Sequence, residues 1–215
     1  GRKILDSEEA LDHFYLNESA YTIFNKDKIH RPRNPEIYKA PYVLFKKGLD
    51  CADYSIRAVY TESDFLYRET INCIKGSEKD KKTLLNLCGL LNSSLFSYFN
   101  LMLGSSTGIE REQIFLEELG NYPYVYNDEL VELVEKMQRE EWGKNRNELQ
   151  VALNQCVMRM YGLQDNYFVD YALSIQIPML CGTYQETKCD AKTMKKYVSI
   201  LSKIWDEHFG QSNVH

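Results

Sequence analysis

Hydrophobic residues recur at steps of three and four along the middle of the chain, which is the spacing of one face of an α-helix. The residues that follow this spacing are Leu84, Cys88, Leu91, Leu95, Phe99 and Met102. The other faces carry small polar residues, namely Asn86, Asn92, Ser93, Ser97 and Asn100. The pattern predicts one continuous helix that buries its apolar stripe and ends at Gly104, because glycine commonly terminates helices.

Shorter apolar stretches in the first third of the chain are typical of β-strands. Residues 20–24 and 42–45 are rich in aromatic and β-branched side chains, which favour strands. Residues 55–61 and 65–74 alternate between apolar and polar positions on either side of residues 62–64. This arrangement predicts a β-hairpin, and the whole region is expected to form a small, mostly antiparallel sheet.

Helical spacing dominates the second half of the chain. Asn127 is placed to cap a helix whose inward residues are Leu130, Val131, Val134 and Met137. The next helix carries Leu149, Leu153, Cys156, Val157 and Met160 inward and ends at Gly162. Two further helices are expected, from about residue 165 towards 177 and from about residue 190 onwards. The fold class is therefore α+β, with an α+β subdomain over residues 1–125 and a helical subdomain over residues 126–215.

The loop after the predicted central helix has the composition of an anion-binding turn. Ser105, Ser106 and Thr107 lie between two glycines, and Arg111 follows at the start of a short helix expected around residues 110–119. Short hydroxyl side chains and backbone N–H groups before a helix can hold a phosphate, and arginine can contact guanine with two hydrogen bonds. The alternative is an ordinary polar turn in which Arg111 pairs with Glu110 or a neighbouring acid.

Charge is distributed unevenly along the chain. The net charge is −5, which argues against a protein that simply coats DNA. However, basic residues cluster between residues 26 and 47, at Lys26, Lys28, Arg31, Arg33, Lys39, Lys46 and Lys47. Tyrosines accompany this segment and the predicted sheet, at Tyr38, Tyr42, Tyr54, Tyr60 and Tyr67. A DNA-binding surface is one interpretation, and a solvated basic loop beside tyrosines of the core is the other.

The sequence offers little catalytic or metal-binding chemistry. Its four histidines and six cysteines are scattered without a CxxC pair, so we expect free thiols and neither disulfides nor a metal site. There is no glycine-rich loop for a nucleotide-like cofactor, and residues 121–124, NYPY, have the composition of a proline-stiffened turn. No apolar run is long enough to span a membrane, so a cytoplasmic protein is expected. Because the chain begins with Gly1, we expect it to be part of a longer protein.

Several stretches together resemble a known family. The segment GLLNSSLF, residues 89–96, is followed by residues 108–111 and then by Leu119 with Tyr122, Pro123 and Tyr124. This succession is similar to the TaqI-like C-terminal specificity domains of adenine-specific DNA methyltransferases from restriction-modification systems. Residues 153–163 and 197–209 are similar to later helices of that family, so the resemblance spans roughly residues 35–209.

The resemblance implies a DNA target-recognition domain of an adenine-N6 methyltransferase, or of a fused restriction and methylation enzyme. It implies that the fragment itself is not catalytic, that S-adenosylmethionine binds in a catalytic domain upstream, and that double-stranded DNA is the partner. The residues expected to bind DNA are Lys26, Lys28, Arg31, Arg33, Lys46, Lys47, Ser105, Ser106, Thr107 and Arg111. An alternative function is a helical scaffold that docks methylase and nuclease subunits. A third, an independent hydrolase, has no supporting motif.

Overall fold

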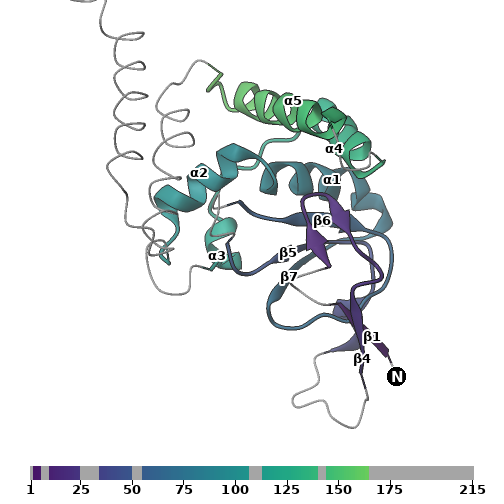
Figure 1. Ribbon diagram of the computed structural model, residues 1–215. Helices are drawn as coiled ribbons and strands as arrows, with labels where there is room; N and C mark the ends of the chain where they lie inside the picture. The colour runs from purple at the N-terminus through teal and green to yellow at the C-terminus, as the bar shows by residue number, and fades with distance from the viewer. Residues whose placement is uncertain are drawn as a thin grey trace, which may run out of the picture. The chain divides into compact units, whose positions relative to one another are not determined.

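The computed structural model describes residues 2–5, 10–24, 34–49, 55–106, 113–139 and 144–164 (Figure 1). The chain divides into two compact units, Gly1–Asp50 with Ser55–Asp165 and Cys51–Tyr54 with Asn166–His215. All described residues belong to the first unit. The helices predicted after residue 165 lie outside the described residues.

The described strands form three antiparallel sheets. Their bounds are β1 Arg2–Leu5, β2 Leu11–Asp12, β3 Tyr15–Leu16, β4 Tyr21–Phe24, β5 Tyr42–Lys46, β6 Ala58–Thr61 and β7 Ile71–Lys75. Strand β1 pairs with β4, β2 pairs with β3, and the third sheet has the order β6-β5-β7. The predicted strands at 20–24 and 42–45 are thus confirmed as β4 and β5.

The predicted hairpin between residues 55–61 and 65–74 is wrong. Both β6 and β7 pair with β5, on its two sides, and not with each other. The reason is that β5 has no polar alternation: Tyr42 through Phe45 are all fully buried. A strand that is apolar on both faces is stabilised most in the centre of a sheet, and it takes that position here.

The predicted central helix is two helices, α1 Lys81–Leu91 and α2 Ser94–Leu103. The break falls at Asn92 and Ser93, because their side chains form hydrogen bonds with backbone groups and thereby compete with a continuous helix. The Ser93 hydroxyl caps α2 by accepting the Phe96 N–H at 3.3 Å. The Asn92 amide donates to the Ala58 carbonyl on β6 at 2.8 Å. Because α2 is a separate element, Met102, predicted to lie inward, is 54% exposed.

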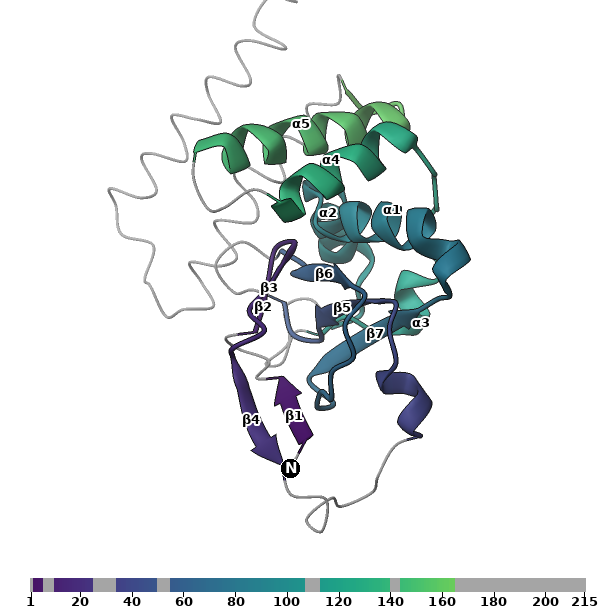
Figure 2. The same cartoon turned by 90° about the vertical axis from the view of Figure 1, so that its right-hand side faces the viewer.

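Helices α4 and α5 form a second layer, in which α4 packs on α1. The bounds of the remaining helices are α3 Leu116–Leu119, α4 Asp128–Arg139 and α5 Lys144–Met160, with two 3-10 turns, η2 Pro35–Tyr38 and η3 Glu78–Asp80. Helix α1 contacts β5 and β6 on one side and α4 on the other, and α4 contacts α5. Figures 1 and 2 show the resulting order, with the β6-β5-β7 sheet, then α1 and α2, then α4 and α5.

Gly89 permits the close approach of α1 and α4. A Cβ atom at this position would lie 2.8 Å from both Leu130 Cδ1 and Val134 Cγ2. The inward residues predicted for α4 are all buried, and Asn127 caps it by accepting the Glu129 N–H at 2.7 Å. The GLLNS segment of α1 therefore sets two features of the fold, the α1–α4 contact at Gly89 and the α1–α2 break at Asn92 and Ser93.

The α+β fold class is confirmed. The predicted boundary at residues 125 and 126 stays a prediction, because the helical half is described only as far as residue 164. No helix in the described part of the chain combines the length and apolar content that crossing a membrane requires.

Candidate nucleic-acid interface

Two groups of predicted DNA-binding residues meet at the end of β5. Lys46 is the last residue of β5, and Lys47 follows it. The Lys47 N–H donates to the Thr70 carbonyl at 2.8 Å, and the Lys47 carbonyl accepts the Ile114 N–H at 2.8 Å. Gly48 forms an antiparallel bridge with Gln113. The chain that returns from the predicted anion-binding loop is therefore held against the residues that follow β5.

The start of that loop is tied to the same place. Ser106 is buried, and its hydroxyl donates to the Gln113 carbonyl at 2.6 Å and accepts the Gln113 N–H at 2.8 Å. Residues 106 and 113 are thus joined in both directions, and Gln113 in turn bridges Gly48. The structure brings Lys46 and Lys47 together with Ser105 and Ser106, although about sixty residues separate the two pairs in the sequence.

The geometry gives the two serines different chemistry. The only hydroxyl proton of Ser106 is used in the bond to Gln113, so this side chain joins the ends of the loop. The Ser105 backbone N–H lies 3.3 and 3.4 Å from the two carboxylate oxygens of Glu118 on α3. A phosphate at this N–H would have to displace Glu118. DNA contact by either serine stays a prediction.

The other predicted residues lie outside the described residues, in two separate stretches. Lys26, Lys28, Arg31 and Arg33 belong to residues 25–33, and Thr107 and Arg111 belong to residues 107–112. The stretch 25–33 begins directly after β4, and one residue, Asn34, separates it from η2. The exposed pair Lys39 and Glu36 of η2 is joined by a salt bridge of 2.8 Å. Lys39 therefore has an acidic partner within the protein.

Two arginines near the end of β5 are not among the residues that the sequence pattern indicated. Arg57 precedes β6, and its carbonyl accepts the Lys46 N–H at 3.3 Å. Its guanidinium lies 3.6 Å from the Asp12 carboxylate. Arg68 is exposed in the turn before β7, where its carbonyl accepts the Ile71 N–H. Both are isolated in the sequence, and only the pairing of β5 with β6 and β7 places their backbones beside Lys46 and Lys47.

The tyrosines near the basic segment are mainly core residues. Tyr42, Tyr60 and Tyr67 are at most 7% exposed. The Tyr67 hydroxyl donates to the Ile37 carbonyl at 2.8 Å, and the Tyr42 hydroxyl donates to the Ser63 carbonyl at 2.9 Å. Burial raises the pKa of both phenols well above the usual value. These three tyrosines stabilise the fold, as the interpretation that they are tyrosines of the core predicted. Tyr54 lies outside the described residues.

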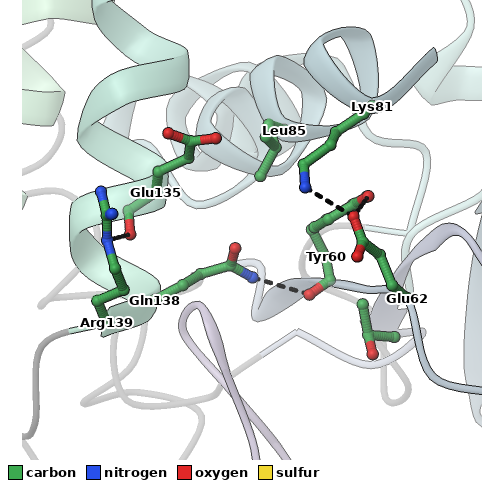
Figure 3. A pocket seen from close by; sticks show the side chains of 8 residues that line it. Tyr60, Glu62, Lys81, Leu85, Glu135, Gln138 and Arg139 are labelled. Carbon is green, nitrogen blue, oxygen red and sulfur yellow. Dashed lines mark hydrogen bonds and ion pairs between the residues drawn. The ribbon is translucent and has the colours of Figure 1, made fainter. Parts of the chain in front are cut away.

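An open cleft of about 380 Å³ lies between β6, α1 and α4 (Figure 3). It is at the other end of β5, because Thr61 on its wall pairs with Tyr42. Within it, Glu62 accepts hydrogen bonds from Lys81 at 2.8 Å and from Tyr60 at 2.7 Å. These hydrogen bonds lower the pKa of Glu62, and the bond from Lys81 has the larger effect. This paired charge makes the cleft a less suitable site for a polyanion than the end of β5.

Metal binding finds no support in the described residues, where no group of three His, Cys, Asp or Glu side chains is placed to hold an ion. The three cysteines that can be described, Cys73, Cys88 and Cys156, are free thiols. Burial raises the pKa of Cys88 to about 12, so this thiol is not a reactive nucleophile at neutral pH.

Comparison with known protein families matches residues 3–124 to the TaqI-like C-terminal specificity domain. The match starts upstream of the expected resemblance and ends before residues 153–163 and 197–209, whose likeness to the family stays a prediction. It covers β1 to β7, α1 to α3 and both groups of residues at the end of β5. A search of curated proteins found no match.

Proposed function

Because this chain belongs to the TaqI-like C-terminal specificity domain family, we propose that it recognises the target sequence of a restriction-modification adenine-N6 DNA methyltransferase. Membership of the family implies DNA recognition in such methyltransferases. The finer proposal is that residues 1–125 contact double-stranded DNA and that this chain performs no catalysis itself. A fused restriction and methylation enzyme is included in the proposal, because the same domain would serve both activities.

The observation that supports this proposal most is the convergence at the end of β5. Lys46, Lys47 and the loop that begins at Ser105 come from separate parts of the sequence. They are held together by the backbone hydrogen bond between Ile114 and Lys47 and by the bond from the Ser106 hydroxyl to the Gln113 carbonyl. Lysine contacts to phosphate supply affinity, and contacts to base edges supply sequence preference. An adjacent lysine pair and loop would provide both from one surface.

The proposal assigns S-adenosylmethionine to a catalytic domain outside this chain. Methyltransferases hold this cofactor with a glycine-rich turn between a strand and a helix. In the described part of the chain, β7 leads through η3 into α1, and its turn contains one glycine, Gly76. A Cβ atom there would lie 3.0 Å from Asp80 Cβ, so the side chain of Asp80 occupies the space beside this glycine, which supports the proposal.

The alternative function, a scaffold that docks methylase and nuclease subunits, is favoured by a different observation. Met102 and Leu103 at the end of α2 and Leu116 on α3 are between 47% and 64% exposed. Exposed apolar side chains of this size are typical of protein contacts when they form one patch. Both functions are compatible in one protein, but DNA recognition has the additional support of the family.

The experiment is a titration of short duplex DNA with the whole chain over a range of salt concentrations. Each phosphate contact contributes about 0.9 to the slope of log affinity against log salt. Replacing Lys46 and Lys47 by alanine should reduce the slope by up to about two units if both contact phosphate. The control is Lys82→Ala with Lys136→Ala, two exposed lysines of α1 and α4. Equal slopes for the two double variants would contradict the proposed surface.

A further inference from the structure

The hydrogen bonds of β5 show which backbone groups face outward from the β6-β5-β7 sheet, because alternate residues of an antiparallel strand bond to opposite neighbours. The Lys46 N–H donates to the Arg57 carbonyl on the β6 side, and the Lys47 N–H donates to the Thr70 carbonyl on the β7 side. Figure 2 shows β6 and β7 on the two sides of β5. The residues whose backbone groups face outward are therefore Ala58 and Tyr60 on β6, and Ile71, Cys73 and Lys75 on β7.

The chain itself covers the edge formed by β6. The Ala58 N–H donates to Asn92 Oδ1 at 3.1 Å, and the Ala58 carbonyl accepts the Phe14 N–H at 2.9 Å. The Tyr60 carbonyl accepts a hydrogen bond from Gln138 Nε2 at 2.8 Å. Other elements of the fold therefore occupy this edge, and a further strand could not pair with it.

The edge formed by β7 lacks such hydrogen bonds within the described part of the chain. The Ile71 N–H donates to the Arg68 carbonyl at 3.1 Å, in the turn before the strand. The Ile71 carbonyl and both backbone groups of Cys73 and Lys75 have no hydrogen-bond partner among the described residues. Lysines on edge strands often prevent pairing, but the Lys75 ammonium donates to the Glu36 carbonyl of its own chain. Strand β7 can therefore pair with a further strand.

Strand β7 is complementary to a second copy of itself. Cys73 is the middle residue of the strand, Ile71–Lys75. Two copies related by a two-fold axis beside Cys73 would pair antiparallel, with Cys73 opposite Cys73 and Ile71 opposite Lys75. This register forms about four backbone hydrogen bonds, between the two Cys73 residues in both directions and from each Lys75 N–H to the opposite Ile71 carbonyl. The Ile71 N–H can stay in its turn.

Charges beyond the two ends of β7 favour the same arrangement. Arg68 lies three residues before Ile71, and Glu78 lies three residues after Lys75. Antiparallel pairing of two copies would therefore bring Arg68 of each copy towards Glu78 of the other. Both side chains are exposed, and neither forms an ion pair within the part of the chain that the structure describes. Lys75 would lie opposite the apolar Ile71, so the register does not place the two Lys75 side chains together.

We propose that two copies of this chain associate through β7 and form one continuous antiparallel sheet across a two-fold axis at Cys73. Such a dimer goes beyond the proposed DNA recognition and does not depend on it. The contact is small, because a pair of five-residue strands buries less than the about 1,200 Å² at the lower end of stable interfaces. We therefore expect a weak and reversible dimer.

The test is sedimentation equilibrium of the whole 215-residue chain, from micromolar to millimolar concentration, with a reducing agent that prevents disulfides. The unaltered chain should form dimers as its concentration rises. Arg68→Glu alone and Glu78→Arg alone should each weaken association by about tenfold, because each brings like charges together at both ends of the contact. An equimolar mixture of the two variants should restore association, because opposite charges face each other again in the mixed dimer.

A second variant, Cys73→Pro, tests the backbone pairing itself. Proline removes the outward N–H but leaves the bonds of Asn72 and Ile74 to β5, and edge strands tolerate it at such positions. This variant should remain folded by circular dichroism and should not dimerise. If it does not fold, the exchange of charges alone decides.

The matched control is Lys136→Glu, which makes the same change of charge as Arg68→Glu at an exposed position of α4. It should leave association unchanged. An unaltered chain that stays monomeric over the whole range overturns the proposed dimer. Association that Arg68→Glu weakens no more than Lys136→Glu does, or a mixture of the two charge variants that stays monomeric, also overturns it. The proposed DNA recognition stands in each of these cases.

Discussion

Replacing Asn92 by alanine tests how the break between α1 and α2 is held. The Asn92 Oδ1 atom accepts the Ala58 N–H at 3.1 Å, and Nδ2 donates to the carbonyls of Ala58 and Cys88, each at 2.8 Å. Because Nδ2 donates to these carbonyls, Oδ1 is the acceptor that faces His13, 2.9 Å from its Nδ1. The His13 Nδ1 atom therefore carries a proton in this arrangement.

The cost of Asn92→Ala follows from which groups keep a partner. The Ala58 carbonyl still accepts the Phe14 N–H at 2.9 Å, and the Cys88 carbonyl still accepts the residue 92 N–H at 3.2 Å. The Ala58 N–H, in a residue that is 0% exposed, loses its acceptor. An unsatisfied buried donor costs about 1–3 kcal/mol, and the lost bonds to the carbonyls add about 1 kcal/mol. We expect the free energy of unfolding to fall by about 2–4 kcal/mol.

The assay is urea denaturation followed by far-UV circular dichroism, with Asn121→Ala as the control. Asn121 also donates from Nδ2 to a backbone carbonyl four residues earlier, that of Glu117 at 3.1 Å, but it is exposed. Its replacement should change the free energy of unfolding by less than about 0.5 kcal/mol. An equal, small effect of both replacements would refute the assignment of Asn92 as the residue that holds the break.

Three further predictions concern the packing, the cleft and the loop. Gly89→Ala should lower the free energy of unfolding by about 1–2 kcal/mol in the same assay, because crowding against Leu130 and Val134 outweighs the gain in helix propensity. The control is Gly120→Ala, which should not lower it, because the added Cβ would lie no nearer than 3.5 Å to another atom. Lys81→Gln should raise the pKa of Glu62 towards its usual 4.5 in a carboxyl-carbon NMR titration. Because the pKa of Glu62 is lowered in the folded state, this exposed pair stabilises the fold above pH 4.5, by under about 1 kcal/mol. That contribution is lost as the pH falls through the pKa of Glu62 in the folded state. If Lys81→Gln left the pKa of Glu62 unchanged, the pairing in solution would be excluded. Arg111→Ala in the full-length enzyme should relax target preference at one base pair by about 1–3 kcal/mol if Arg111 contacts guanine. A uniform loss of methylation over a library of sites would indicate a phosphate contact. No change in either would mean that the loop is only a turn.

The local sequence pattern was sufficient to predict elements whose first and last residues do not depend on contacts with distant parts of the chain. The aromatic and β-branched content of residues 42–45 predicted β5, and the spacing of apolar residues after Asn127 predicted α4 with its cap. The break between α1 and α2 was not predictable in this way. It depends on the bonds from Asn92 to Ala58, a residue 34 positions away in the sequence.

The candidate interface shows the same limit. The sequence indicated Lys46, Lys47 and the loop at Ser105 separately, because clusters of charge and small polar residues are local features. Their convergence depends on the bridge from Gly48 to Gln113 and on the buried Ser106 hydroxyl. Burial of Tyr42 and Tyr67 depends likewise on packing between strands, so the sequence could not separate core tyrosines from surface ones.

Target recognition is tested most directly by mapping N6-methyladenine in the DNA of cells that express the methyltransferase to which the proposed function assigns this chain. The family-matched residues 3–124 would be exchanged for the matching segment of a family member with a different target. The methylated sequence should change to that of the donor of the segment. An active exchanged enzyme that still methylates the original sequence would contradict target recognition by this chain.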